Sequence, residues 1–327
     1  MESATPDQGA TASLPLTHVE TRDGAATLMR VTNWVVGLYI GFVLTAMLAL
    51  GITPGVDVAL LLAGVGLLFI ARGWPLARDW GPFLIILLGW EAQRGIAAGF
   101  GQTLPADLIV GIERTLMGGF LPTVEVQAAL RSPGGLITPL DIVLSAVYLA
   151  HFVYPVVFAF WLWTADRVRY YRFLVTLVAV SFAAFFTFLL LPVAPPRFAL
   201  VNGAPLPITD VMAEVSRSLG WGGFSSMYEH MLGNPLAAFP SMHAAYPVLV
   251  LLFLRERSRR AAWLWAPFVG LIWFATVYLG HHYVIDLLAG GLYAVAFYQL
   301  ARLPWSEIAE RLTRGVGDRI FERVERG

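Results

Sequence analysis

The chain has 327 residues, of which 57% are hydrophobic and only 13% are charged. About a quarter of the residues in a soluble domain are charged, so this composition excludes an ordinary soluble protein and indicates a polytopic membrane protein. The net charge is zero, which gives no electrostatic reason to expect nucleic-acid binding. The absence of cysteine excludes disulfides, thiolate metal sites and cysteine nucleophiles.

Residues 1–30 are polar and lack the hydrophobic stretch of a signal peptide, so we expect a mostly disordered cytoplasmic tail. Eight apolar stretches follow, most of them near the ~20 residues that span a bilayer. They lie at 33–51, 56–72, 82–100, 138–163, 172–191, 241–254, 261–280 and 282–301. The sixth is short unless its helix continues through Arg255. The pattern predicts an all-α polytopic membrane protein with about eight transmembrane helices, forming one domain over 31–303.

The arginines predict how these helices are oriented. They are concentrated in alternate loops and in the C-terminal tail, whereas the loop at 52–55 and the turn near Gly280 carry none. Because cytoplasmic loops hold the excess of basic residues, we expect both termini in the cytoplasm and the chain in the inner (plasma) membrane of the cell. The long segments 101–137 and 192–240 are then extracytoplasmic. Residues 304–327 place apolar side chains at helical spacing among charges, which predicts a cytoplasmic amphipathic helix.

Three short motifs lie at the predicted outer ends of their helices. Pro192–Phe198 follows the fifth apolar stretch, Phe239–His243 opens the sixth, and Gly280–Asp286 opens the eighth. All three fall on one side of the membrane, so we expect them to converge. Ionisable groups are costly near lipid, which favours a functional role for the cluster.

The residue types in these motifs match the needs of phosphoryl transfer. His282 and Asp286 are four apart and share a helix face, so the carboxylate can hold Nδ1–H and leave Nε2 as a nucleophile. His243 can protonate a leaving oxygen. Ser241 lies at a helix start, where free N–H groups favour an anion, and Arg197 can grip phosphate oxygens in a bidentate manner. No metal and no cofactor are expected.

Other interpretations of these residues remain open. A histidine inside a membrane is often a hydrogen-bonded packing residue. His243, His281 and His282 with Asp286 allow a metal site, although no adjacent cysteine and no HExxH pattern supports one.

Five further residues are secondary candidates, beside the proposed catalytic and phosphate-binding residues His282, His243, Asp286, Arg197 and Ser241. Arg94, with Glu91 beside it in the third apolar stretch, lies near the outer end and can supply a further phosphate-binding charge; the alternative is a structural Glu91–Arg94 pair. His151, His281 and Tyr283 are candidates for headgroup contacts, with packing as the alternative for His151 and a helix cap for His281.

The motifs resemble those of the type 2 phosphatidic acid phosphatase superfamily, through Pro240-Ser-Met-His243 and His282-x-x-x-Asp286 after an arginine motif. Within it, Ala194-Pro-Pro-Arg197 and Tyr278-Leu-Gly-His-His282 are most similar to the inositol phosphorylceramide synthase branch. The resemblance implies a six-helix core in the C-terminal three quarters of the chain. It also implies a phosphohistidine on His282, supported by Asp286, with His243 as general acid.

This sequence departs from the phosphatase members at three positions. Leu190 stands where they carry lysine, Phe198 where they carry proline, and Thr276 where they carry arginine. A site with fewer cations suits a monoanionic phosphodiester better than a nearly dianionic monoester.

We therefore expect a membrane enzyme that moves an inositol-phosphate-type headgroup from a phospholipid donor to a lipid or glycolipid acceptor, with its active site on the extracytoplasmic side. The alternatives are a lipid phosphatase or diphosphatase that uses water, and a non-enzymatic lipid transporter or binding protein.

Overall fold

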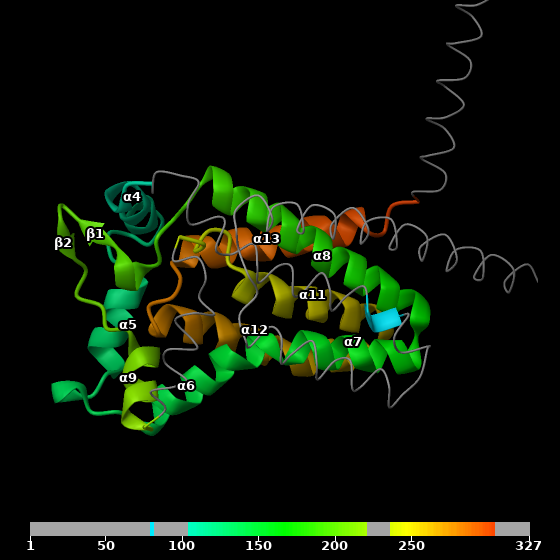
Figure 1. The fold of residues 1–327 in the computed structure, drawn as a ribbon, viewed down its shortest axis with the longest axis horizontal. Helices are drawn as coiled ribbons and strands as arrows, with labels where there is room; N and C mark the ends of the chain where they lie inside the picture. The colour runs from blue at the N-terminus through cyan, green and yellow to red at the C-terminus, as the bar shows by residue number, and fades with distance from the viewer. Residues whose placement is uncertain (1–78, 82–103, 221–235, 305–327) are drawn as a thin grey trace, which may run out of the picture.

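The computed structural model describes residues 79–81, 104–220 and 236–304, which form a helical bundle with a small cap at one end (Figure 1). The bundle consists of α6 (Pro139–Leu149), η2 (Ala150–Phe152), α7 (Tyr154–Ala165), α8 (Arg167–Leu190), α11 (Met242–Arg257), α12 (Arg259–Tyr278) and α13 (Val284–Leu300). The cap consists of α4 (Ala106–Leu116), α5 (Pro122–Leu130), η1 (Pro133–Gly135), η3 (Pro196–Phe198), β1 (Leu200–Val201), β2 (Ala204–Pro205) and α9 (Val211–Ser218). The two short strands pair antiparallel.

The chain is a mostly helical membrane protein. Helices α8 and α12 are long and apolar enough to cross a membrane, and α6 with α7 passes the same test as a pair bent by 45°. The described part thus contains two candidate spans, or three if the bent pair is one span. The predicted count of about eight is not confirmed: α11 and α13 have only 16 and 17 residues, and 33–51, 56–72 and 82–100 lie outside the described residues.

The ends of several predicted segments differ from the structure. Helix α11 continues to Arg257, so the short sixth stretch does extend through Arg255. The predicted span 138–163 is interrupted at η2, just before Pro155, which lacks the backbone N–H that a continuous helix would donate to the carbonyl of His151. The predicted tail 1–30 and the segment 305–327 lie outside the described residues.

The basic connections gather at the end of the bundle away from the cap (Figure 1). There Arg169 and Arg172, near the start of α8, both pair with Glu256 near the end of α11. Asp79 joins the same end, where its carboxylate accepts from Tyr171 Oη at 2.7 Å and pairs with Arg167. The alternating arginines of the sequence therefore correspond to one end of the folded bundle.

Helix α11 lies in the middle of the bundle, between α13 and α12 in the view of Figure 1. The N–H of Ser241, just before α11, donates to the carbonyl of Asp286 in α13 at 2.9 Å. One turn further along α13, Gly290 lies against the Ser241 backbone so closely that a Cβ would overlap the Ser241 carbonyl oxygen. This close approach requires glycine at 290.

The substitution Gly290→Ala is expected to destabilise the protein by about 1–3 kcal/mol, because the added methyl group must push the starts of α11 and α13 apart. The matched control is Gly270→Ala in α12, where a Cβ meets nothing within 4 Å and alanine favours helix by up to about 1 kcal/mol. Thermal unfolding in detergent micelles, followed by tryptophan fluorescence, measures both. Equal stability of the two variants would contradict the close contact.

Candidate active site

The structure brings the three motifs together at the cap end of the bundle. The N–H of Arg197 donates to the carbonyl of Gly280 at 3.1 Å, which joins the first motif to the third. The Ser241–Asp286 bond joins the second motif to the third. Val193 forms a parallel bridge with Ala237, which joins the first motif to the chain just before the second. Backbone hydrogen bonds therefore fix all three motifs relative to one another.

His282 is held through its Nδ1 atom by two acceptors. Nδ1 lies 3.0 Å from the carbonyl oxygen of Ala238 and 3.3 Å from Oδ2 of Asp286. Because both partners accept, Nδ1 carries a proton, and in the neutral ring Nε2 is then the basic nitrogen. The contact with Asp286 follows from the i,i+4 spacing. The contact with the Ala238 carbonyl was not predicted, because every residue has a backbone carbonyl and the residue type does not show which one will accept.

Asp286 is fully buried and organises the start of α13. Its Oδ2 accepts from the N–H of Tyr283 at 2.9 Å, in addition to the contact with His282. The turn before it depends on Gly280, whose φ of +78° lies in the left-handed region. A Cβ there would also meet Ile208 Cγ2 at 2.9 Å. The glycine therefore lets the chain turn tightly between α12 and the two histidines.

His243 lies within a column of stacked rings. Its ring centroid is 4.1 Å from that of Tyr148 and 3.9 Å from that of His151, and both pairs are stacked. His151 stacks in turn on Tyr246 at 4.9 Å. The centroid of His282 is 5.5 Å from that of His243. The break between α6 and α7 places His151 in this column, so His151 belongs to the same cluster as the motif histidines.

Arg197 is held by two side chains, one at Nη1 and one at Nε of its guanidinium. Nη1 lies 2.5 Å from Nδ1 of His281, and Nε lies 3.1 Å from Oδ2 of Asp210. The pKa of His281 is lowered well below its usual value, first by burial and then by the neighbouring side chains of Arg197 and His282. His281 is therefore neutral, and its Nδ1 accepts from the arginine. The sequence indicated a headgroup contact or helix cap for His281 and gave no role to Asp210.

Ser241 occupies the N-cap of α11 and is fully buried. Its hydroxyl oxygen accepts from the N–H of Ala244 at 3.3 Å, so part of the helix start is capped by the protein itself. Its role in binding phosphate stays a prediction, as do the catalytic roles of the other motif residues. Glu91 and Arg94 lie outside the described residues. Within 79–81, 104–220 and 236–304, no group of three or more histidine and acidic side chains is arranged to hold a metal ion.

A family model described as the PAP2 superfamily matches residues 120–300, more than half of the chain. The chain belongs to the PAP2 superfamily. The matched range includes all three motifs, together with Tyr148 and His151. It excludes α4, which contributes to the cap.

Curated relatives of this PAP2 chain carry related names. A phosphoinositol dihydroceramide synthase of Bacteroides thetaiotaomicron is 30% identical over 163 residues, covering 46% of this chain and 52% of the relative. The inositol phosphorylceramide synthase catalytic subunit of Saccharomyces cerevisiae is 28% identical over 120 residues, covering 34% of this chain and 29% of the relative. That of Schizosaccharomyces pombe is 32% identical over 114 residues, covering 33% and 25%.

The chain thus spans about half the length of the bacterial relative, and less of the yeast proteins. No solved structure matches the chain. The resemblance to the inositol phosphorylceramide synthase-like branch of the PAP2 superfamily is confirmed.

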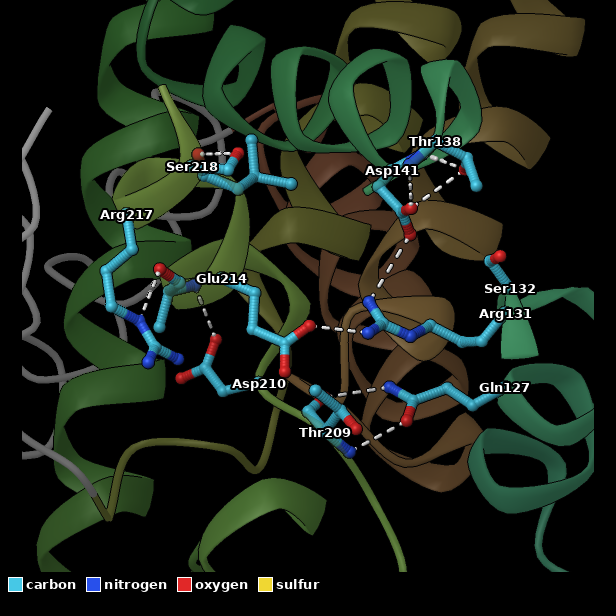
Figure 2. Close-up of polar contacts among 12 residues, drawn as sticks. Gln127, Arg131, Ser132, Thr138, Asp141, Thr209, Asp210, Glu214, Arg217 and Ser218 are labelled. Carbon is cyan, nitrogen blue, oxygen red and sulfur yellow. Dashed lines mark hydrogen bonds and ion pairs between the residues drawn. The ribbon is translucent and has the colours of Figure 1, made fainter. Parts of the chain in front are cut away.

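Outside the PAP2 motifs, a polar network ties the cap to the bundle (Figure 2). Arg131, just after α5, pairs with Glu214 of α9 at 2.5 Å and with Asp141 of α6 at 3.5 Å. The amide of Gln127 donates to the carbonyl oxygens of Thr209 and Tyr278 and accepts from the N–H of Thr209. This network fixes the segment that carries Asp210.

A second cap residue, Glu113 of α4, closes the start of α13. Its carboxylate oxygens accept from the N–H groups of Val284 at 2.8 Å and Ile285 at 3.1 Å, directly after His282 and Tyr283. The side chain is buried. The pKa of Glu113 is raised, mainly because burial disfavours the charged form, although both hydrogen bonds oppose the shift. The sequence offered one signal, the charged residues Glu113 and Arg114 with apolar residues on both sides.

Replacing Glu113 by glutamine is expected to change how stability depends on pH. A carboxyl with a raised pKa binds its proton more tightly in the folded chain, so stability falls as pH rises from the unfolded value of 4.5 through the raised one. Glutamine does not titrate. The midpoint temperature of Glu113→Gln minus that of the wild type should therefore increase between about pH 4 and 7.

Tryptophan fluorescence in detergent micelles gives both midpoints. Glu125→Gln, at an exposed carboxylate of α5, controls for the loss of a negative charge from the cap. A midpoint difference for Glu113→Gln that stays constant or decreases with pH would contradict the raised pKa.

Proposed function

We propose that this protein is a membrane phosphotransferase that moves an inositol-phosphate-type headgroup from a phospholipid to a lipid or glycolipid hydroxyl. The single observation that carries the proposal is the arrangement of His282. Its Nδ1 is fixed by Asp286 and the Ala238 carbonyl, with the ring of His243 at 5.5 Å. The names of the relatives from the inositol phosphorylceramide synthase-like branch support the headgroup type.

In the first half-reaction, Nε2 of His282 attacks the phosphorus of the donor diester. The bond from phosphorus to the lipid oxygen breaks, and His243 donates a proton to that oxygen. The headgroup phosphate remains on His282 as a phosphohistidine. Asp286 and the Ala238 carbonyl stabilise the positive charge that develops on the imidazole, because both accept from Nδ1. Arg197 and Ser241 bind the phosphate oxygens.

In the second half-reaction, an acceptor hydroxyl attacks the same phosphorus. His243 now takes the proton of that hydroxyl, and the bond from phosphorus to Nε2 of His282 breaks. The new diester leaves, and both histidines return to their starting states. Water in place of the lipid hydroxyl would make the protein a phosphatase. Few cations at the site support a diester donor, since Leu190 and Thr276 stand where the phosphatase members carry lysine and arginine.

Purified protein in vesicles with phosphatidylinositol labelled in its headgroup tests this function. With an acceptor lipid present, label should pass to that lipid, and rapid denaturation in detergent at mildly alkaline pH, where the phosphorus–nitrogen bond of phosphohistidine survives, should trap label on the protein. His282→Gln should abolish the trapped label and lower turnover by at least about a thousandfold, because no nucleophile remains. Release of free inositol phosphate at the same rate with and without acceptor would favour the phosphatase, and trapping on His282→Gln would exclude this residue as the nucleophile.

We further propose that the site faces the extracytoplasmic side of the inner (plasma) membrane, with about eight spans in a catalytic domain over 31–303 and both termini inside. The proposal assigns 1–30 to a cytoplasmic tail and 304–327 to a cytoplasmic helix. The arginine-rich connections at the end of the bundle opposite the cap support this orientation.

Cysteine labelling tests this orientation, because the chain has no cysteine of its own. Ala204→Cys, exposed in the cap, should react with a membrane-impermeant thiol reagent in intact cells. Arg260→Cys, exposed near the start of α12 at the opposite end, should react only after the cells are opened. The reverse pattern would place the site in the cytoplasm.

A further inference from the structure

The carboxylate of Asp210 lies against the one arginine of the three motifs. Its Oδ2 is 3.1 Å from Nε of Arg197, while its Oδ1 accepts from the N–H of Ala213 and caps α9. The Arg197 side chain is only 3% exposed, whereas that of Asp210 is 27% exposed. Asp210 comes from the cap rather than from a motif, and no step of the proposed chemistry uses it.

The geometry leaves part of the guanidinium for a ligand. Arginine has five N–H donors. Nε lies 3.1 Å from Oδ2 of Asp210 in an ion pair without hydrogen-bond geometry, and one Nη1 donor faces Nδ1 of His281. The second Nη1 hydrogen and the two on Nη2 remain, enough to grip a phosphate in a bidentate manner. Asp210 at Nε and His281 at Nη1 therefore hold the arginine on two sides, and neutral His281 does so without adding charge.

The pairing also changes the charge that a phosphate meets. A buried arginine alone would present a full positive charge, which attracts a dianion about twice as strongly as a monoanion. With Asp210 beside it, the pair is neutral overall, and much of that advantage of the dianion is lost. Arg131, in the polar network between cap and bundle, does not supply the missing positive charge, because it is itself paired with Glu214 and Asp141.

We propose that Asp210 is a specificity-determining residue that biases the site toward monoanionic phosphodiesters and against dianionic phosphomonoesters, through its ion pair with Arg197. This inference rests on the proposed function for the identity of the diester. The effect of Asp210 on dianion binding does not depend on that identity, because Asp210 weakens the binding of any dianionic phosphate at this site.

The test is the substitution Asp210→Asn. Asparagine is as good an N-cap as aspartate, so α9 keeps its cap while the negative charge is removed. The ratio of kcat/KM for phosphatidic acid to that for phosphatidylinositol, at about pH 8, should rise about tenfold, because the monoester carries a second negative charge there. A merely structural role of Asp210 would lower both values together and leave the ratio unchanged.

Glu214→Gln is the matched control. Glu214 lies on the same helix and is 29% exposed, but its carboxylate pairs with Arg131 instead of Arg197 (Figure 2). We expect the ratio of this variant to equal that of the wild type. An equal rise in both variants would indicate a general effect of charge in the cap and would overturn the proposal.

A binding measurement separates this inference from the proposed function. Titration of the wild type and Asp210→Asn with inorganic phosphate at about pH 8 reports dianion affinity without turnover, and we expect about tenfold tighter binding by the variant. If the wild type transfers no headgroup but the variant binds phosphate more tightly, the proposed function fails and the role of Asp210 stands. If the wild type transfers headgroups but neither the ratio nor the phosphate affinity changes, the role of Asp210 is wrong.

Discussion

The site depends on the close contact between the starts of α11 and α13. His243 lies in one of these helices, and His282 immediately precedes the other, so the relation between the two histidines follows from how the helix ends meet. The Ser241 N–H to Asp286 carbonyl bond sets that relation, and the absence of a side chain at Gly290 permits it. The same carboxyl-bearing residue, Asp286, also contacts His282. Helix packing and imidazole orientation are thus coupled through one residue.

Around this contact, positive and negative groups are closely balanced. Arg197 faces Asp210, and the N–H groups at the start of α13 face Glu113. A helix start with free N–H groups would attract an anion, but Glu113 already occupies this one. The dipole of α13 is therefore directed at a protein carboxylate, and in the proposed function phosphate binding falls to Arg197 and the start of α11. Within the part of the chain that the structure describes, a site balanced in this way has little surplus positive charge to offer a dianion.

The sequence was sufficient to predict the motifs, their side of the bundle and the i,i+4 contact of His282 with Asp286, because these depend on local spacing and on the arginine pattern. It was not sufficient for contacts that join distant segments. The Ala238 carbonyl and the N–H partners of Glu113 are backbone groups, and the contacts of backbone groups cannot be predicted from residue types. Asp210 looked like an ordinary loop acid, since its partner Arg197 is near it only after the cap folds. The bend at η2 had a visible cause in Pro155, yet the stacking of His151 on His243 depends on the tertiary packing of η2 against α11.

The division between bundle and cap suggests how one reaction is adapted to different substrates. The groups proposed to break and form bonds, His243 and His282, lie in or next to bundle helices, where buried packing fixes their geometry. The acids that adjust the surrounding charge, Glu113 and Asp210, come from the cap. Asp210 is partly exposed and held by a polar network, in which Gln127 and Arg131 anchor its neighbours. A change in the cap therefore alters the charge that a substrate meets without repacking the helices that position the histidines. Under the proposed function, selection among phosphate headgroups can then vary separately from the phosphoryl-transfer chemistry itself.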